Sequence, residues 1–173
     1  REIPTTSRSA LQGAGFTIVE ERQPSFLFDN SVLITGEVDR TTGYEPGFPV
    51  QDAWHNDHWE PDPLVLDDQA VVVNVRDHGL VVITGCGHAG IVNITRYTLA
   101  LTGLSQVYGI FGGFYLNGPM FAPLIDRVCA DLAAFQPSLI VPAHCTGWRA
   151  QHALARTFGG AYVPDCVGTR FTL

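Results

Sequence analysis

The chain has 173 residues, with 17 acidic against 10 basic side chains and a formal net charge of −7. All ten basic residues are Arg, which excludes lysine chemistry such as Schiff-base formation or phosphate binding by a P-loop lysine. The acidic balance and the lack of a basic cluster argue against nucleic acid or an anionic membrane as a partner. With 46% apolar and 16% charged residues, residues 1–173 are expected to form a single packed domain.

The cysteines are expected to remain free thiols. A chain of this size does not need disulfide cross-links, and no apolar run approaches the roughly 18 residues that a membrane-spanning helix requires. We therefore predict a soluble, cytoplasmic protein. The four cysteines are Cys86, Cys129, Cys145 and Cys166.

The N-terminal third has weak secondary-structure signals. Residues 5–13 predict a short helix that ends at a glycine, and residues 16–20 and 31–38 predict strands. Residues 40–62 are rich in Gly, Pro, Trp, His and Asp and have no periodicity. They are predicted to form a long loop, which in a packed domain is usually functional or mobile.

From Asp67 onward, predicted strands and helices alternate. The first two strands are joined by a short turn and are expected to form a hairpin. The alternation that follows predicts right-handed crossovers and a largely parallel sheet. The predicted strands are 70–75, 80–84, 106–111, 139–141, 161–163 and 169–173, and the predicted helices are 91–102, 119–135 and 148–158.

Three of the predicted strand-to-helix loops are rich in small residues. In an α/β sheet the loops at the carboxyl ends of parallel strands lie at one edge, and ligands bind there. Two of these loops contain both a Cys and a His, so segments far apart in the sequence are expected to bring these side chains together. The loops read Thr-Gly-Cys-Gly-His-Ala-Gly over 84–90, Phe-Gly-Gly-Phe-Tyr-Leu-Asn-Gly over 111–118, and Val-Pro-Ala-His-Cys-Thr-Gly over 141–147.

Cys86, His88 and His144 are the candidate metal ligands on these loops. Thiolate and imidazole suit Zn²⁺, and Fe or Mn become alternatives where a carboxylate joins the site. For each residue alone, a packed thiol or an ordinary hydrogen-bonding imidazole is the competing interpretation. Cys145 is expected to pack beside His144 rather than to ligate. Asp68 is either a turn residue or a carboxylate at the site.

The long loop contains a second polar cluster. His55, Asp57 and His58 could bind a metal, although exposed loops also collect such residues for solubility. Trp54 and Trp59 flank the cluster and either line a substrate pocket or attach the loop to the core. The sequence is compatible with both interpretations.

The ordered motifs of the chain resemble those of the metallo-β-lactamase superfamily. Within it, they are similar to the branch of metal-dependent hydrolases that includes the dihydropterin ribofuranosyl-aminobenzene phosphate synthases. The resemblance covers roughly residues 31–173. It is carried by Asp-Asp-Gln-Ala over 67–70, Val-Ile-Thr-Gly-Cys-Gly-His-Ala-Gly-Ile over 82–91, Phe-Gly-Gly-Phe over 111–114, and Pro-Ala-His-Cys-Thr-Gly over 142–147.

The resemblance implies a four-layer αββα sandwich with a metal site, usually binuclear, at the shared edge of two sheets. The superfamily hallmark His-x-His-x-Asp-His is not found; residues 55–58 match only part of it, and Ala53 stands where its first His belongs. We therefore expect the chain to be the C-terminal portion of a longer chain of this fold, with a mixed sheet and flanking helices. The missing ligands would lie upstream of Arg1 or on a partner chain.

The resemblance also implies roles for single residues. Cys86 occupies the position of a bridging ligand, His88 belongs to a Gly-Cys-Ser-His signature in which Gly87 replaces Ser, and His144 matches the last metal-binding His. Tyr115 stands where this branch usually has His, and its hydroxyl can donate a hydrogen bond to an oxyanion. Asp68 is expected to orient a metal ligand.

These residues predict a metal-dependent hydrolase that uses one or two Zn²⁺ ions. A metal-activated water would attack an ester, phosphoester or amide-like bond of a small-molecule substrate. This chain alone is expected to be inactive or nearly so, and homo-oligomer formation is left open. Two alternatives are a metal-free enzyme with Cys86 as nucleophile, and a non-catalytic member that binds a pterin-like or phosphorylated ligand.

Overall fold

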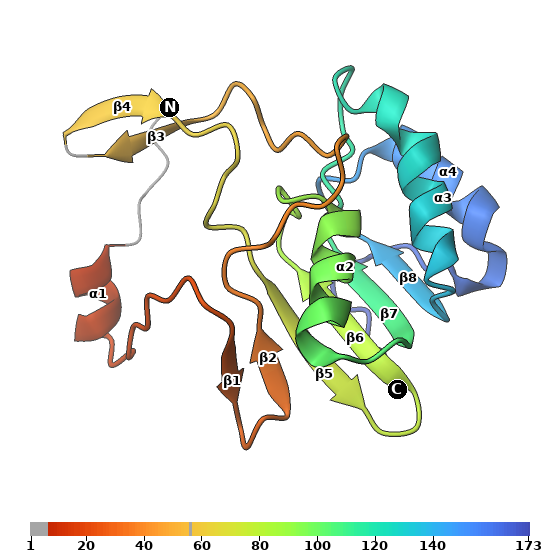
Figure 1. Ribbon diagram of the computed structural model, residues 1–173, viewed down its shortest axis with the longest axis horizontal. Coiled ribbons are helices and arrows are strands. Elements are labelled where there is room, and N and C mark those ends of the chain that lie inside the picture. The colour runs from red at the N-terminus through yellow and green to blue at the C-terminus, as the bar shows by residue number, and fades with distance from the viewer. Residues whose placement is uncertain (1–6, 56) are drawn as a thin grey trace.

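The computed structural model describes residues 7–55 and 57–173, and its element order is shown in Figure 1. The helices are α1 (Arg8–Gly13), α2 (Ile91–Thr102), α3 (Ile125–Ala134) and α4 (Trp148–Phe158), with short 3-10 helices η1 (Ala122–Leu124) and η2 (Gly159–Ala161). The strands are β1 (Ser25–Leu27), β2 (Val32–Ile34), β3 (Asp52–His55), β4 (His58–Pro61), β5 (Ala70–Val75), β6 (Gly79–Thr84), β7 (Val107–Gly112) and β8 (Leu139–Pro142).

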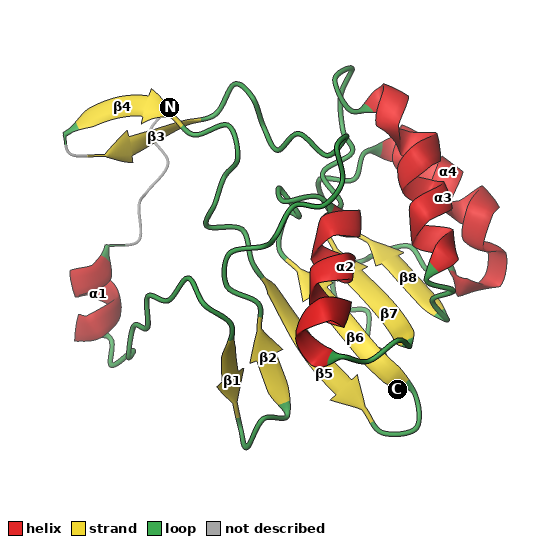
Figure 2. Ribbon diagram, in the orientation of Figure 1, coloured by secondary structure: helices red, strands yellow, loops and turns green. Residues whose placement is uncertain are grey.

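Six strands form one mixed sheet in the order β1-β2-β5-β6-β7-β8. The strands from β1 to β6 pair antiparallel, whereas β6, β7 and β8 are parallel. Helices α2 and α3 connect the parallel strands, as Figure 2 shows. The predicted α/β fold, with a mixed sheet and flanking helices, is confirmed. Strands β3 and β4 form a separate hairpin that extends away from this sheet (Figure 1).

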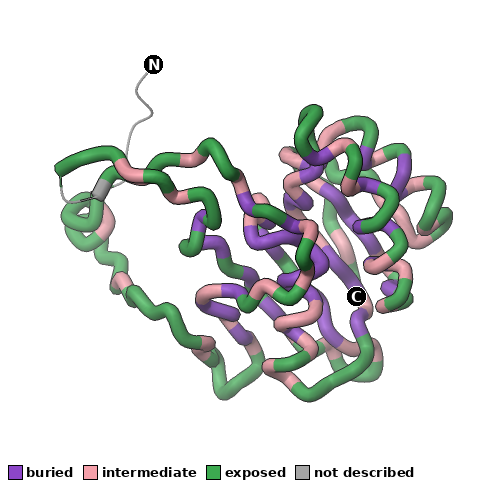
Figure 3. The backbone as a smooth tube through the Cα atoms, turned by 45° about the horizontal axis from the view of Figure 1, so that its top comes forward, coloured by how far each residue is buried: buried purple, intermediate pink, exposed green. Residues whose placement is uncertain are grey.

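The core lies between one face of the sheet and helices α2, α3 and α4. Alternate residues of the central strands point into it, and Val82 and Ile110, which are partners on neighbouring strands, are both 0% exposed. The helices contribute apolar side chains at three- and four-residue spacing, as expected for faces that pack on a sheet. Figure 3 shows that buried residues concentrate here. The largest cluster includes Ile91, Val92, Val107, Ile110, Phe114, Ile125, Val128, Leu132, Ile140 and Leu154.

The opposite face of the sheet is also apolar but much more open. Val71 and Ile83 are cross-strand partners there and remain 36% and 42% exposed. The C-terminal segment reaches this face, because the ring of Phe171 contacts the ring of Phe111 at 5.1 Å between centroids. The two faces of the sheet therefore differ in how far their apolar side chains are buried.

The predicted elements from Ala70 onward agree closely with the structure. Helices α2 and α4 have the predicted bounds, and strands β5 to β8 match within one residue. The predicted helix over 119–135 is shorter: residues 122–124 form η1, and α3 begins at Ile125. The predicted strand over 161–163 is reduced to one bridge between Ile140 and Tyr162.

Several predictions for weaker segments were wrong. Residues 16–20 and 169–173 are not strands, since neither segment finds a neighbouring strand to pair with. The strand predicted over 31–38 ends at Ile34, shortly before Gly36 takes a φ of +65°. The predicted loop over 40–62 contains the β3–β4 hairpin. The helix predicted over 5–13 begins at Arg8, and residues 5 and 6 lie outside the described part of the chain.

Within the described ranges, no helix combines the length and the apolar character that crossing a membrane requires.

The two faces of the sheet predict different costs for the same substitution. Ile110→Ala removes a fully buried side chain and should lower the free energy of unfolding by about 2–5 kcal/mol. Ile83→Ala, on the neighbouring strand and the open face, should lower it by about 1 kcal/mol or less. Urea denaturation of both variants measures the difference. Equal losses would contradict the view that only one face is packed.

Candidate functional site

Three loops meet at the edge of the sheet where β6, β7 and β8 end. The loop after β7 lies between the other two and is bonded to both through the backbone. The N–H of Gly113 donates to the carbonyl of Gly85 at 2.8 Å, and the N–H of Ala143 donates to the carbonyl of Gly112 at 2.7 Å. The predicted convergence of the loops at one edge is therefore present in the structure.

Glycine is required for this close approach. A Cβ added to Gly113 would lie 2.4 Å from the sulfur of Cys145 and 2.9 Å from the Cα of Cys86. Both distances are too short for non-bonded atoms, so a larger residue here would force the loops apart. The Gly-Gly pair at the end of β7 thus allows residues of the β6–α2 and β8–α4 loops to come into contact.

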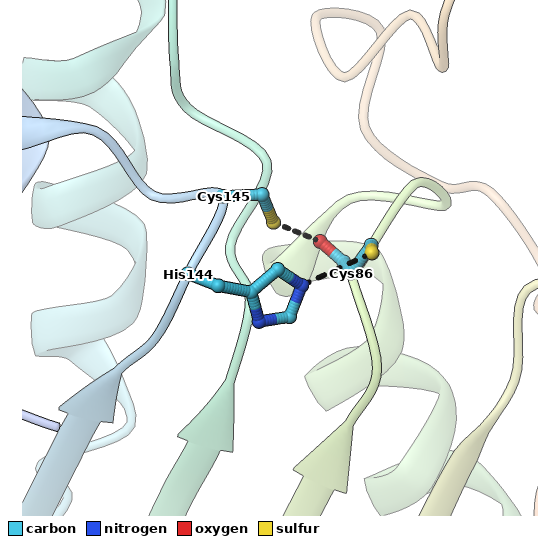
Figure 4. A group of neighbouring side chains, drawn as sticks. All are labelled: Cys86, His144 and Cys145. Carbon is cyan, nitrogen blue, oxygen red and sulfur yellow. Dashed lines mark hydrogen bonds between the residues drawn. The ribbon is translucent and has the colours of Figure 1, made fainter. Parts of the chain in front are cut away.

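Cys86, His144 and Cys145 form the central group of the site (Figure 4). One ligand atom from each residue lies within 4.8 Å of the others. Sγ of Cys86 is 3.1 Å from Nε2 of His144, and the thiol of Cys145 donates to the carbonyl oxygen of Cys86 at 3.0 Å. Two sulfurs and one imidazole nitrogen therefore face a common point.

The three side chains differ in exposure. His144 is exposed, whereas Cys86 and Cys145 are half-buried. Burial raises the pKa of Cys145 to about 11, so this thiol keeps its proton at neutral pH. A bound cation would favour the thiolate, because metal ligation requires deprotonated sulfur. All four cysteines of the chain are free thiols.

Cys145 was not expected in this group. A Cys next to a metal ligand more often packs than ligates, so His144 alone was predicted as the ligand of its loop. The structure has a tight turn here instead, closed by the N–H of Thr146 donating to the carbonyl of Ala143 at 3.0 Å. The turn lets two consecutive side chains reach the same site. The adjacent Cys and His at the end of a strand were the available sequence signal.

His88 lies beside this group rather than within it. Its Nδ1 is 3.9 Å from Oδ1 of Asp68, and its ring packs edge-on against Tyr115 with 4.3 Å between ring centroids. Asp68 is buried, and its other oxygen accepts a 2.9 Å hydrogen bond from the N–H of Ala89. Of the three predicted ligands, the structure thus brings Cys86 and His144 together, and it places the third, His88, beside Asp68 and Tyr115.

Tyr115 is held in an unusual conformation between aromatic neighbours. It has a φ of +49°, uncommon for a residue with a side chain, and its ring contacts those of Phe48 and Phe121. Burial raises the pKa of its hydroxyl, which therefore remains a hydrogen-bond donor at neutral pH. Tyr115 and His88 also line a small pocket of about 20 Å³, roughly the space of one water molecule.

Glu45 fixes the beginning of α2 behind this pocket. Its carboxylate is buried and accepts hydrogen bonds from the N–H groups of Val92 at 3.0 Å and Asn93 at 2.9 Å. Gly90 occupies the N-cap position and has no side chain of its own to cap the helix, so Glu45 satisfies these donors from the long loop. Burial raises the pKa of Glu45, and the hydrogen bonds oppose that shift. Sequence reasoning did not identify this role, because Glu45 and α2 are far apart in the chain.

The second polar cluster is exposed on the β3–β4 hairpin. Nε2 of His58 lies 3.7 Å from a carboxylate oxygen of Glu60, and the rings of Trp54 and Trp59 contact each other across the strands. Both Trp side chains are more than half exposed, so they do not attach the loop to the core. Asn56 and the side chain of His55 lie outside the described residues. Among the residues whose side chains are described, the group of three potential metal ligands is Cys86, His144 and Cys145.

The role of Glu45 predicts a loss of stability from Glu45→Ala. Two buried N–H groups at the start of α2 would lose their acceptor, which should cost about 1–3 kcal/mol of unfolding free energy. Glu21→Ala is a matched control, since Glu21 also accepts two backbone N–H bonds, but at an exposed position where water can replace it. Its cost should stay within about 0.5 kcal/mol. Thermal or urea denaturation tests the pair, and similar costs would contradict the capping role.

The chain is similar to proteins of known sequence and to a solved structure. No protein-family model matches the chain. It is 28% identical over 93 residues to the 7,8-dihydropterin-6-methyl-4-(beta-D-ribofuranosyl)-aminobenzene-5'-phosphate synthase of Methanocaldococcus jannaschii, covering 54% of this chain and 31% of that protein. It is 29% identical over 151 residues to the uncharacterized protein MJ0448 of the same organism, covering 84% of this chain and 51% of that protein.

Among solved structures, the chain resembles Tm1679, described as a metal-dependent hydrolase of the beta-lactamase superfamily. The TM-score is 0.75 at 28% identity, and the match covers 91% of this chain and 58% of that one. The chain thus spans about a third to about three fifths of the length of these relatives. It has the metallo-β-lactamase fold, and its resemblance to this superfamily and to the branch of the dihydropterin ribofuranosyl-aminobenzene phosphate synthases is confirmed.

Proposed function

We propose that this chain contributes the Cys86, His144 and Cys145 side of a zinc site in a metal-dependent hydrolase. The observation that carries the proposal is the convergence of three donor atoms within 4.8 Å from two different loops. The description of Tm1679 as a metal-dependent hydrolase supports the same class of reaction. The relation to a synthase supports a small-molecule substrate in place of a macromolecule.

The chemistry of the donors fits a zinc ion. Two thiolates and one imidazole are borderline-to-soft ligands, which suit Zn²⁺ better than the harder Mn²⁺. Catalytic zinc sites commonly have three protein ligands and leave one position open for water or substrate. The exposure of His144 leaves this side of the group accessible from solution. A second ion, or a further ligand such as His88, remains part of the proposal.

The surrounding residues have separate roles in the proposed reaction. When bound, the metal would lower the pKa of a coordinated water and polarise the scissile oxygen of an ester, phosphoester or amide-like bond. Tyr115 keeps its phenolic proton and can donate a hydrogen bond to the oxyanion that develops. Asp68 positions the β6–α2 loop through Ala89 and orients His88.

The proposal extends to the location and the partners of the protein. Since the donors must be reduced thiols to bind metal, we propose a cytoplasmic location, where thiols stay reduced. The acidic chain favours neither nucleic acid nor a membrane surface as a partner. Further ligands from a preceding segment or a partner chain, and homo-oligomer formation, remain predictions.

A second candidate function rests on the pair formed by Cys86 and His144. A sulfur 3.1 Å from an imidazole nitrogen is the arrangement of a nucleophile and its base in cysteine enzymes. Metal chelation and thiol alkylation separate the two candidates. Hydrolysis that survives a chelator and is lost on alkylation of Cys86 would establish the cysteine mechanism and exclude the zinc mechanism.

Zinc titration of purified variants tests the proposed site. Replacing a residue that binds the metal directly should weaken zinc binding by at least about 100-fold. Replacing a residue that only hydrogen-bonds to a ligand typically weakens metal binding by about 10- to 100-fold. Isothermal titration and metal analysis measure the effect. Variants expected to show the large loss are Cys86→Ser, His144→Ala and Cys145→Ser, and a smaller loss is expected for His88→Ala and Asp68→Asn.

Two matched controls lie away from the site. Cys166 is exposed and outside the donor group, and His152 is an exposed residue of α4, so Cys166→Ser and His152→Ala should bind zinc as the parent chain does. A loss for His88→Ala as large as for His144→Ala would show that His88 is itself a ligand. Zinc affinity that no cysteine or histidine variant changes would overturn the proposed site.

A further inference from the structure

We propose that Cys86 and Cys145 form a reversible disulfide, so that the metal site can be closed by oxidation. The inference rests on the proposed function only in one respect, namely that the bond would control metal binding. The formation of the bond itself is a property of the two thiols and can be tested without any metal or substrate.

The fold places the two thiols together although they are 59 residues apart in the sequence. Their sulfurs lie within 4.8 Å of each other, and the sulfur of Cys145 already reaches the backbone carbonyl of Cys86 at 3.0 Å. A disulfide joins sulfurs about 2 Å apart. The two sulfurs therefore need to approach each other by less than about 3 Å. A change of rotamer at one or both cysteines can move a sulfur that far.

The surroundings of the thiols favour this closure. The loops that hold them are both hydrogen-bonded to the end of β7, Gly85 to Gly113 and Ala143 to Gly112, so the two cysteines keep their proximity. Gly113 leaves open the space next to both residues, where a Cβ would contact the Cys145 sulfur. Figure 4 shows Cys145 pointing across from the β8–α4 loop toward Cys86. The other two cysteines have no comparable position, since Cys129 is buried in α3 and Cys166 lies in the exposed C-terminal segment.

The oxidation requires a hydroperoxide as co-reactant. The sulfur of Cys86, which is half-exposed, attacks the O–O bond of hydrogen peroxide. A sulfenic acid forms on Cys86, and its thiol proton, accepted by His144, passes to the departing hydroxide to give water. The sulfur of Cys145 then attacks the sulfenic sulfur and its proton leaves with the second hydroxide as water. Two thiols and one H₂O₂ thus give one disulfide and two waters. A dithiol then restores both thiols by thiol–disulfide exchange and is itself oxidised to a disulfide.

Disulfide formation and metal binding would exclude each other. Both sulfurs of the three-donor group are consumed in the bond, and only the imidazole of His144 remains. Zinc bound to the thiolates would in turn protect them from peroxide. Oxidation would therefore switch off the metal site reversibly, and metal loading would determine how sensitive the site is to oxidation.

Mass spectrometry of the purified protein tests the inference. After treatment with an equimolar amount of H₂O₂, unfolding and alkylation, two of the four cysteines should be alkylated. Peptide mapping should identify Cys86 joined to Cys145 within one molecule, and dithiothreitol should restore four reactive thiols. Cys166→Ser should form the same bond, whereas Cys86→Ser and Cys145→Ser should not. Zinc added before the peroxide should slow formation of the bond at least 10-fold.

The possible outcomes separate this inference from the proposed function. Four alkylated thiols, a sulfinic acid at Cys86 without a cross-link, or a bond that involves Cys166 would overturn the inference, and the parent protein alone suffices to see them. A disulfide that forms in a protein without zinc affinity would support the switchable thiol pair and contradict the zinc site. Tight zinc binding without a disulfide would do the reverse.

Discussion

The site depends on the contact between three backbone segments at the carboxyl edge of β6, β7 and β8. Gly112 and Gly113 make this contact possible, because a Cβ at Gly112 would lie 2.0 Å from the carbonyl oxygen of Thr84. The same two residues provide the backbone groups that bind the neighbouring loops. The three donor residues can therefore lie close together only because Gly112 and Gly113 have no side chains.

The acidic residues nearest the site hold its backbone. Glu45 and Asp68 are both buried, and both accept hydrogen bonds from N–H groups at the end of the β6–α2 loop or the start of α2. Neither carboxylate belongs to the donor group, which consists of two sulfurs and one imidazole nitrogen. Carboxylates bonded to backbone N–H groups are suited to fixing a loop, and the soft donors remain available for an ion or for redox chemistry.

Cys86 and His88, which belong to one sequence motif, make contacts in two different places. Cys86 and His88 are two residues apart, and both were expected to face the metal. The structure directs Cys86 toward His144, and His88 toward Asp68 and Tyr115. The result is a sulfur-rich group beside a polar and aromatic pocket.

The elements that were predicted correctly are those whose apolar side chains are buried in the core. Strands β5 to β8 and helices α2 and α4 were predicted almost residue for residue, because their apolar residues recur with the period of the structure they form. Phe16 and Val19 show the opposite case. They lie in a segment that was predicted as a strand, yet they remain 63% and 78% exposed because no strand pairs with them. A local pattern cannot supply the pairing partner that a strand needs.

The sequence by itself determined the α/β alternation, the edge where the site forms and the superfamily of the fold, since these follow from periodicity and from ordered motifs. It also predicted that Cys86 and His144 would meet at this edge, as they do in the structure. Only the tertiary structure decided that Cys145 joins them, that His88 turns aside, and that Glu45 caps a helix from a distant loop. These outcomes depend on turns and hydrogen bonds between segments far apart in the chain, where neither strand period nor helix period predicts the direction of a side chain.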